Sequence, residues 1–355
     1  MSAFTLSEGR ATWRFGRAGV SGVVHVRAVV AAVVLAALAF TGFVLSLATG
    51  DLSLPLADVV PAVFGRGDPA TLLVVQELRM PRALVALLVG FAFGLSGAVF
   101  QTMSRNPLAS PDLIGVTSGA QAAVVAGLVV GWGAGVGSQV LGLLGAFVAG
   151  ALVYVLSLGG SRGATGYRLI LVGIGVSWAF TSLTDYLLAK ALPYQANAAV
   201  AWLVGNLNER NWGHVRPLVL SCAVLVPVTL LLSRWLKTLQ LGDAVAAGLG
   251  TPVGAVRFAL LLVASGLAAF ATSAAGPILF VALVGPQIAQ RVAGTPTPPL
   301  IGSALTGSVL VLGADLVSRH VLVDVHLPVG VVTGILGAPV LLWLLTRANR
   351  SGSGG

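Results

Sequence analysis

Charged residues are scarce in this chain of 355 residues: Asp, Glu, Lys and Arg make up 9% of it, while 57% is hydrophobic. A soluble domain carries about a quarter charged residues, because its surface must face water. The mean hydropathy of +0.97 therefore leaves no water-facing surface for a soluble fold. Since a spanning helix needs about 20 mainly apolar residues, the composition predicts an all-α, polytopic membrane protein.

Residues needed for disulfides, phosphate binding and metal binding are also few. Cys222 is the one cysteine, so an internal disulfide is excluded. The two lysines, Lys190 and Lys237, stand outside any G-x-x-x-x-G-K-[ST] motif, which excludes a P-loop of that form. The four histidines fall in predicted tails or loops. We therefore expect no metal site and no bound cofactor, and any linked ATP hydrolysis must occur on another polypeptide. The formal charge of +9 comes from scattered arginines that form no patch, so nucleic acid is not an expected partner.

Ten apolar stretches are separated by segments that contain Gly, Pro and Arg, and each is predicted to span the membrane. They lie at residues 28–48, 82–102, 113–131, 139–158, 168–189, 216–233, 257–273, 278–293, 300–318 and 329–346. If the N-terminus is cytoplasmic, thirteen of the twenty Lys and Arg residues fall inside and seven outside. The sequence thus predicts two cytoplasmic tails, 1–27 and 348–355, around a single transmembrane domain at 28–347. The segment 51–65 is too short and broken to span, and we expect an amphipathic piece at the interface.

Two stretches, beginning at Arg82 and Arg257, resemble each other weakly and enter the membrane from opposite sides in this ten-span arrangement. That polarity is expected of an inverted repeat, which is frequent in transporters. Chance similarity between Ala/Leu/Gly-rich segments explains the likeness equally well, so both readings stay open.

Small residues recur at helical spacing, where they allow helix backbones to approach closely. They are Gly90, Gly94 and Gly97 in one span, and Gly330, Gly334 and Gly337 in another. Packing within one subunit is the simpler reading; lining of a solute pathway, or a seam between subunits, is the alternative. Asp185 and Asp315 fall near predicted outer ends of spans, where a capping or snorkelling role competes with a functional one.

Two inner loops carry the most informative polar residues. Arg105, Asn106 and Pro107 begin a segment that Pro111 also keeps out of helix, so it must be a non-helical connection. The longest inner loop covers 234–257, and its Gly and Pro residues predict two short helical pieces, the first beginning near Asp243. An ordinary connecting loop is the alternative to a surface for a partner protein.

The chain resembles, from about residue 28 to 347, the iron-siderophore and vitamin B12 importer permeases of the ABC superfamily, the FecCD family. The resemblance rests on ordered segments at compatible spacing. They are RMPRALVALLVG (79–90), LSGAVFQ (95–101), RNPLASPDLIGVTSGA (105–120), LGDAVAAGLG (241–250), AGPILFVALVGPQIA (275–289) and LPVGVVTGILGAPVLLWLL (327–345).

The resemblance implies a type II ABC importer permease in the bacterial cytoplasmic membrane, surrounded by lipid and paired with an identical or paralogous permease. Two ATPase subunits, which use ATP and Mg²⁺, would bind the inner face at the coupling segment. Its residues here are Leu241, Gly242, Asp243, Ala246, Ala247, Gly248, Leu249 and Gly250, with a continuation to about Val256. An extracytoplasmic siderophore-binding protein would dock outside through its acids, opposite Arg79 and Arg82 and, less securely, Arg319. Bidentate binding of carboxylates by arginine makes this chemically reasonable; interfacial anchoring is the alternative.

The implied function is import of ferric siderophore by alternating access, with no enzyme activity in this chain. Gln287, where much of the family has histidine, and the segment 201–212 resemble the ferric-enterobactin branch and favour a catecholate ligand. We expect the 82–102 span, which includes Gln101, and the 168–189 span to line the pathway. An ion-gradient-driven secondary transporter is the alternative and would need facing intramembrane acids. An intramembrane enzyme is disfavoured, because no histidine falls within a predicted span.

Overall fold

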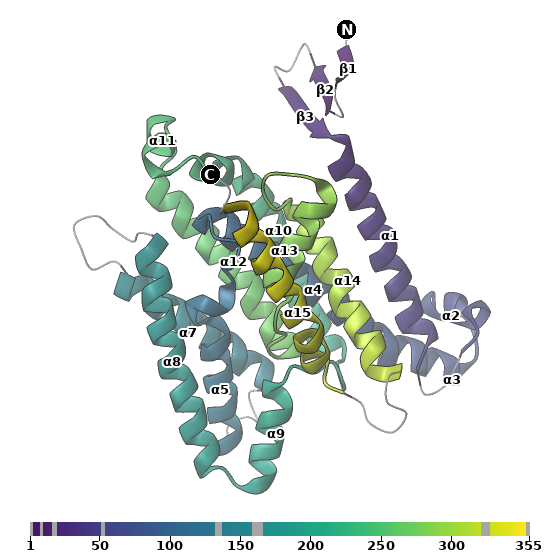
Figure 1. Ribbon diagram of the computed structural model, residues 1–355. Coiled ribbons are helices and arrows are strands. Elements are labelled where there is room, and N and C mark those ends of the chain that lie inside the picture. Colours follow the sequence, from purple (N-terminus) through teal and green to yellow (C-terminus); the bar gives the residue numbers. More distant parts are fainter. Residues whose placement is uncertain are drawn as a thin grey trace.

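The computed structural model describes residues 3–7, 10–15, 20–50, 54–131, 137–157, 166–320 and 327–352. Each of the ten predicted spans coincides with a helix, which confirms the helical membrane domain (Figure 1). These helices are α1 (Val26–Ala48), α4 (Met80–Ser104), α5 (Val116–Val130), α7 (Ser138–Ser157), α8 (Gly166–Lys190), α10 (Trp212–Leu239), α12 (Val253–Ala275), α13 (Val281–Ala293), α14 (Leu300–His320) and α15 (Val329–Gly352).

The connections contain shorter elements. They are α2 (Leu56–Val63), α3 (Pro69–Leu72), the π-helical turn η1 (Leu73–Arg79), the 3-10 turn η2 (Pro111–Ile114), α9 (Pro193–Leu203) and α11 (Asp243–Gly248). Helix α2 matches the short amphipathic piece predicted at 51–65, of which residues 51–53 lie outside the described part. Seven helical stretches among the described residues are long and apolar enough to cross a membrane.

Helix α13 is too short for a complete crossing. Its 13 residues extend about 20 Å at ~1.5 Å per residue, against a hydrocarbon core of about 30 Å. The predicted span at 278–293 therefore begins too early, because the chain is non-helical after Gly276 and Phe280 adopts a left-handed conformation with φ 66°. Helix α5 and the apolar part of α15 are also shorter than the seven membrane-long stretches.

Helix α4 forms the centre of the bundle, where it packs against α10, α12, α13 and α14. It is apolar on all sides, which is the pattern of a helix surrounded by protein, and most of its residues are buried. By contrast, only 17% of the apolar window of α1 is buried. We conclude that α4 leaves little surface for lining a pathway, contrary to the expectation for the 82–102 span.

The helix pair α4 and α14 owes its close approach to small residues. A Cβ atom at Gly90 would lie 2.3 Å from the carbonyl oxygen of Gly307, and one at Gly94 would lie 2.2 Å from that of Ser303. Gly97 approaches α13 in the same way, with Ala282 O 1.8 Å from the position of its Cβ. These glycines therefore serve packing within this chain.

Three segments meet near the end of the bundle opposite α11, and each contains a glycine. A Cβ atom would lie 2.2 Å from Pro277 O at Gly205, 2.5 Å from Trp202 O at Gly276, and 1.8 Å from Val204 O at Gly330. The amide of Gly330 also donates to Gly205 O at 3.1 Å. Gly205 and Gly276 have φ of 76° and 75°, which a side chain rarely adopts. Here the closest approaches between the three segments are to backbone atoms.

The ends of the chain differ in detail from the predicted tails. Within the predicted tail 1–27, β1 (Ala3–Ser7), β2 (Arg10–Phe15) and β3 (Val20–His25) form an antiparallel sheet that the sequence analysis did not anticipate. At the other end, α15 continues past residue 347 to Gly352, and residues 353–355 lie outside the described part. The sheet, the end of α15 and α11 lie at the same end of the bundle (Figure 1).

Candidate functional sites at the two ends of the bundle

Arg79 stands at the end of η1 and has a buried side chain, 7% exposed. Its Nη1 donates to Leu47 O at 2.8 Å and to Ala48 O at 3.0 Å, the last carbonyl groups of α1. A cation at the C-terminal end of a helix satisfies orphan carbonyls and opposes the negative end of the helix dipole. Arg79 therefore closes the outer end of α1 within this chain.

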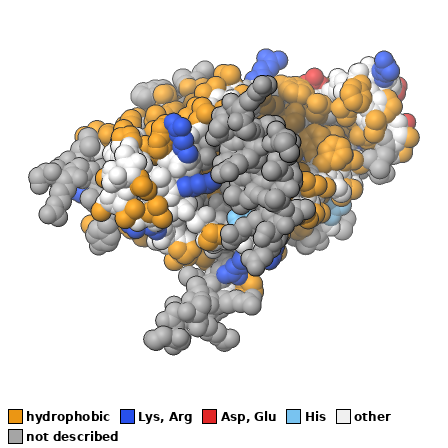
Figure 2. Space-filling view, turned by 90° about the horizontal axis from the view of Figure 1, so that it is seen from above, with side chains coloured by type: hydrophobic (Ala, Val, Ile, Leu, Met, Phe, Trp, Pro, Cys, Tyr) orange, Lys and Arg blue, Asp and Glu red, His pale blue; other side chains and the backbone are white. Residues whose placement is uncertain are grey.

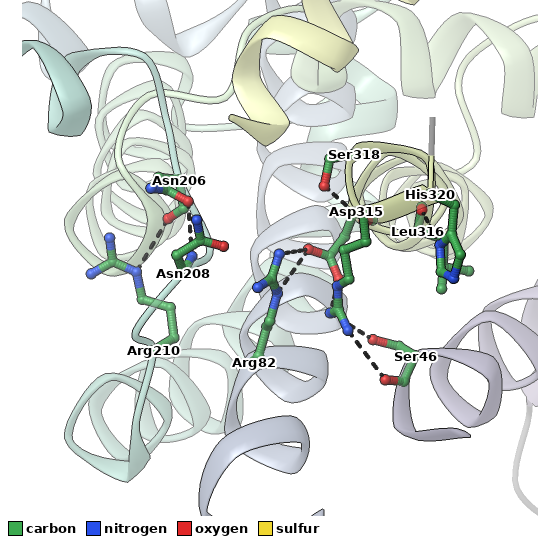
Figure 3. Close-up of polar contacts among 10 residues, drawn as sticks. Ser46, Arg82, Asn206, Asn208, Arg210, Asp315, Leu316, Ser318 and His320 are labelled. Atoms are coloured by element: carbon green, nitrogen blue, oxygen red, sulfur yellow. Dashed lines mark hydrogen bonds and ion pairs between the residues drawn. The ribbon is translucent and has the colours of Figure 1, made fainter. Parts of the chain in front are cut away.

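Arg82 and Arg319 share one buried carboxylate, Asp315 (Figure 3). Arg82 Nε and Nη2 donate to Asp315 Oδ1 at 3.0 and 2.8 Å, and Arg319 Nη2 pairs with Oδ2. Arg319 also donates from Nη2 to Ser46 Oγ at 3.1 Å. The side chain of Asp315 is 0% exposed, while those of Arg82 and Arg319 are 20% and 10% exposed. Asp315 thus links α4 and α14 directly, and α1 through Arg319, at the end of the bundle opposite α11, and its role is neither capping nor snorkelling.

Arg210, in the connection between α9 and α10, is a further cation at this end that the sequence analysis did not single out. Its Nε donates to Asn206 O at 3.1 Å, and its Nη1 lies 3.1 Å from His214 Nε2. Burial lowers the pKa of Arg210, Glu209 opposes that shift, and the charge of Arg82 adds to it. No local motif distinguishes Arg210 from other outer arginines, so only the fold brings it toward Arg82.

The internal contacts of these arginines restrict which of them can bind a docking partner without rearrangement. Asp315 is the one carboxylate that pairs with Arg82 and Arg319 among the described residues. Two guanidinium groups on one carboxylate leave an excess positive charge, which suits an acidic partner. Of the three predicted docking residues, Arg82 is the most exposed, so contact through Arg79 or Arg319 requires these side chains to leave their internal partners.

The coupling segment forms a single short helix, α11, at the opposite end of the bundle. Val245 in α11 and Leu249 at its C-cap are 50% and 62% exposed, and their spacing of four places them on one side of the helix. Leu241, 59% exposed, precedes α11 and is separated from it by Gly242. Ala246 points the other way and is fully buried. Asp243, Ala247, Gly248 and Gly250 are also exposed. Figure 1 shows α11 standing apart from the bundle.

Helix α11 is held firmly to the two spans that flank it. Arg257 Nη2 of α12 binds Asp243 Oδ1 at 2.8 Å, and the hydroxyls of Thr238 and Thr251 lie 2.9 Å apart. Gly242, with φ 100°, permits the sharp entry into α11. The predicted second helical piece is wrong as a separate element, because residues 253–256 form the first turn of α12. Pro252 supplies an N-cap rather than a break between two short helices.

The predicted inner loop lies beside this segment. Arg105 ends α4 in a left-handed conformation with φ 53°, and its Nη1 is 3.5 Å from the place a Cβ would occupy on Gly242. Asn106 Oδ1 accepts a bond from Leu108 N at 2.9 Å, which stabilises the turn around Pro107. The predicted non-helical connection is present, and the two inner loops meet in the fold. Because α4 ends and α12 begins here, these helices run in opposite directions, as an inverted repeat requires.

Gln101 and Gln287 form a polar contact between α4 and α13. Gln287 Nε2 donates to Gln101 Oε1 at 2.7 Å, and Gln101 Nε2 donates to Leu283 O at 2.9 Å. Gln101 is 3% exposed, so it contributes to packing. Gly330 and Gly337 are also packing positions, whereas a Cβ at Gly334 would meet open space.

Helix α8 has the exposure that α4 lacks. Its window from Leu171 to Lys190 is 17% buried, and its hydropathy of 1.3 is the lowest of the seven membrane-long stretches. Its exposed residues mix large side chains such as Trp178 and Tyr186 with small or polar ones such as Gly175 and Ser182. Asp185 lies exposed near its outer end. The end-on view toward α11 shows mainly hydrophobic side chains, with arginine and lysine scattered singly among them (Figure 2).

These features define a multi-pass helical membrane protein with distinct sites at its two ends. Residues 26–347 match the model of the FecCD transport family, and the chain belongs to that family.

Individual relatives agree with this assignment over most of their length. The chain is 38% identical to the FepG permease protein of the ferric enterobactin transport system of Escherichia coli, covering 86% of this chain and 92% of that one. It is 37% identical to the FhuG permease protein of the iron(3+)-hydroxamate import system of Bacillus subtilis, covering 86% and 94%. Among solved structures, it resembles an inward-facing metal-chelate type ABC transporter, with a TM-score of 0.75, 28% identity, and coverage of 89% and 98%.

Proposed function

We propose that this chain is the permease subunit of an ATP-binding-cassette importer that carries ferric siderophore across the bacterial cytoplasmic membrane. A second permease, two ATPase subunits and an extracytoplasmic binding protein complete the assembly. The named relatives support this, because they are permease proteins of iron-siderophore systems. Both termini lie on the cytoplasmic side, together with α11.

The observation that carries the proposal is the exposed apolar face of α11. Val245 and Leu249 present apolar side chains on α11 and its C-cap, and Leu241 adds a third just before the helix; all three are at least half exposed among the described residues. Exposed apolar patches rimmed by polar groups mark protein interaction sites. In the proposed assembly, an ATPase subunit covers this face. The ATPase subunit binds and hydrolyses the ATP, and this chain binds no nucleotide.

The contacts that attach α11 to the neighbouring spans explain how the ATPase acts on the pathway. The Asp243–Arg257 pair ties α11 to α12, and the Thr238–Thr251 contact ties the segment to α10. A displacement of α11 therefore moves two spans rather than one flexible loop. Such a rigid connection lets ATP binding favour one of two packings of the spans, which is alternating access.

The proposed pathway lies along α8 where two permeases face each other. Its exposed residues include small and weakly polar ones, among them Gly175 and Ser182, beside larger side chains such as Trp178 and Tyr186. A large chelate passes such a wall without tight binding. The relative from the ferric enterobactin system favours a catecholate siderophore as the ligand.

Reconstitution tests the proposal. The chain, purified with the subunits that accompany it, is placed in vesicles with its binding protein, and radiolabelled ferric enterobactin is offered outside. We expect accumulation only with ATP on the ATPase side, and less accumulation of a ferric hydroxamate. Uptake that persists without any ATPase and collapses with an ionophore would instead identify an ion-driven transporter.

A substitution on α11 tests the proposed contact with the ATPase. Val245→Asp places a charge in the exposed apolar row and should abolish co-purification of the ATPase, because a desolvated charge opposes association. The matched comparison is Ala247→Asp, which adds the same charge to α11 on the side away from Val245 and Leu249 and should cost less ATPase association. Equal loss in both variants would show that α11 has no specific docking face.

A further inference from the structure

The proposed transport steps assign no role to Asp315, a carboxylate at the outer end of the helix bundle. Asp315 is fully buried, and guanidinium groups reach it from α4 and from the next turn of α14. Burying a carboxylate is costly unless it is paired and hydrogen-bonded. The position of Asp315 therefore determines how both arginines are oriented.

The two arginines are held in different ways (Figure 3). Arg319 uses Nη2 on Asp315 and Ser46, and Nη1 donates to Ser46 O at 3.4 Å, so its guanidinium faces into the protein. Its Nε is buried without a partner in the described structure. Arg82 uses Nε and Nη2 on one oxygen of Asp315, and its Nη1 has no hydrogen-bond partner among the described residues. One edge of Arg82 is thus left for a ligand.

The local charge balance favours an acid at that edge. The charge of Arg79 is offset by the carbonyl end of α1. Arg82 and Arg319 together carry two positive charges, and Asp315 supplies one negative charge. Arg210 adds a further cation from the connection between α9 and α10, with Glu209 beside it. An external carboxylate on Arg82 completes the charge balance of Arg82, Asp315 and Arg319.

We propose that Asp315 is a positioning residue for docking of the binding protein. It fixes Arg82 so that Nη1 points to an acid of that protein, and Arg319 acts through Asp315 without touching the partner. This inference rests on the proposed function, since it takes the acidic partner to be the binding protein of the importer. It reduces the three predicted docking arginines to one contacting residue, Arg82.

The sign of one substitution separates positioning from simple charge attraction. Asp315→Asn removes a negative charge beside the arginines, so attraction alone predicts tighter binding of an acidic partner. Positioning predicts weaker binding, because the neutral amide of asparagine holds Arg82 less strongly than the charged carboxylate does. Arg82→Gln should weaken docking by about tenfold or more, as expected when a charge-paired partner is truncated.

The experiment measures the dissociation constant between the reconstituted transporter and the binding protein that supports its ATP-driven uptake. We expect Asp315→Asn to weaken docking by about fivefold or more in the native background, and to have no further effect in the Arg82→Gln background. Equal weakening in both backgrounds would show a general structural defect and overturn the inference. Unchanged or tighter docking of Asp315→Asn would also overturn it.

Ser308→Ala provides a matched control. Ser308 is buried on the same helix, and its hydroxyl donates to Leu87 O of α4 at 2.9 Å, so the variant loses an α14–α4 contact remote from the arginines. Docking should be unchanged, and a loss equal to that of Asp315→Asn would overturn the inference.

A charge-balanced variant covers the case in which Asp315→Asn fails to assemble. Asp315→Asn combined with Arg319→Gln removes the buried carboxylate without leaving an extra buried charge, and Arg82 remains in place. Docking should again weaken by about fivefold or more, whereas native affinity would refute the positioning role. If the unaltered transporter shows no ATP-driven uptake, the proposed function fails instead, so the two failures are distinguishable.

Discussion

Gly97 offers the sharpest test of the packing described above. A Cβ atom added there would lie 1.8 Å from Ala282 O, and the obstacle is backbone, which cannot rotate away. An ordinary carbon–oxygen contact needs about 3.3 Å, so α4 and α13 must separate by about 1.5 Å in Gly97→Ala. Overpacking a core costs about 1–3 kcal/mol. Because neither backbone can yield locally, we expect a loss of about 3 kcal/mol.

Gly334→Ala is the matched control, since Gly334 was predicted to belong to the same class of small-residue face. A Cβ there meets nothing within 4 Å, and Gly334 lies inside α15. Replacing an interior helical glycine by alanine typically stabilises by about 0.5–1 kcal/mol. Reversible unfolding of the purified protein in mixed detergent micelles measures both changes. Native stability for Gly97→Ala, or equal losses in the two variants, would refute the close-contact reasoning.

Three further predictions concern contacts between helices. Arg27→Gln removes the bonds of Nε and Nη2 to Val292 O and Arg291 O at the end of α13; we expect a loss of about 1–2 kcal/mol in the same unfolding assay, and no loss would mean that the terminus is satisfied by other groups. Arg257→Gln frees α11 from α12; ATP hydrolysis should continue while uptake per ATP falls, and a parallel decline of both would contradict the bracing role. Gln287→Leu leaves Gln101 Oε1 buried without its donor, at a cost of about 1–3 kcal/mol; an unchanged midpoint of unfolding would show that the contact is not formed.

The helices of the membrane domain were accessible from the sequence because each depends on a local property, an apolar run between Gly, Pro and charged residues. The length of α13 was not, since the predicted break at 274–277 continues to Phe280, inside an apolar run. The strands in 3–25 were missed for a different reason: that segment had been treated only as a charged tail.

The site residues also divide into those with a local sequence signal and those that depend on distant contacts. The start of α11 at Asp243 follows from nearby residues. The pairing of Arg82 with Asp315 joins positions 233 apart, and the contact of Arg79 with Leu47 joins positions 32 apart. No local pattern contains such pairs, so the sequence identified the arginines without showing that their donors are engaged within the chain.

The three-way crossing at Gly205, Gly276 and Gly330 has a consequence for how this protein can change over time. In an ordinary core, a larger side chain at one position is accommodated by a smaller one opposite. At this crossing the opposing atoms are carbonyl groups, which every amino acid possesses, so no second substitution can make room for a first. Variation here must therefore be all or nothing: the crossing persists with its glycines, or the chain adopts a different path between α9, α12 and α15.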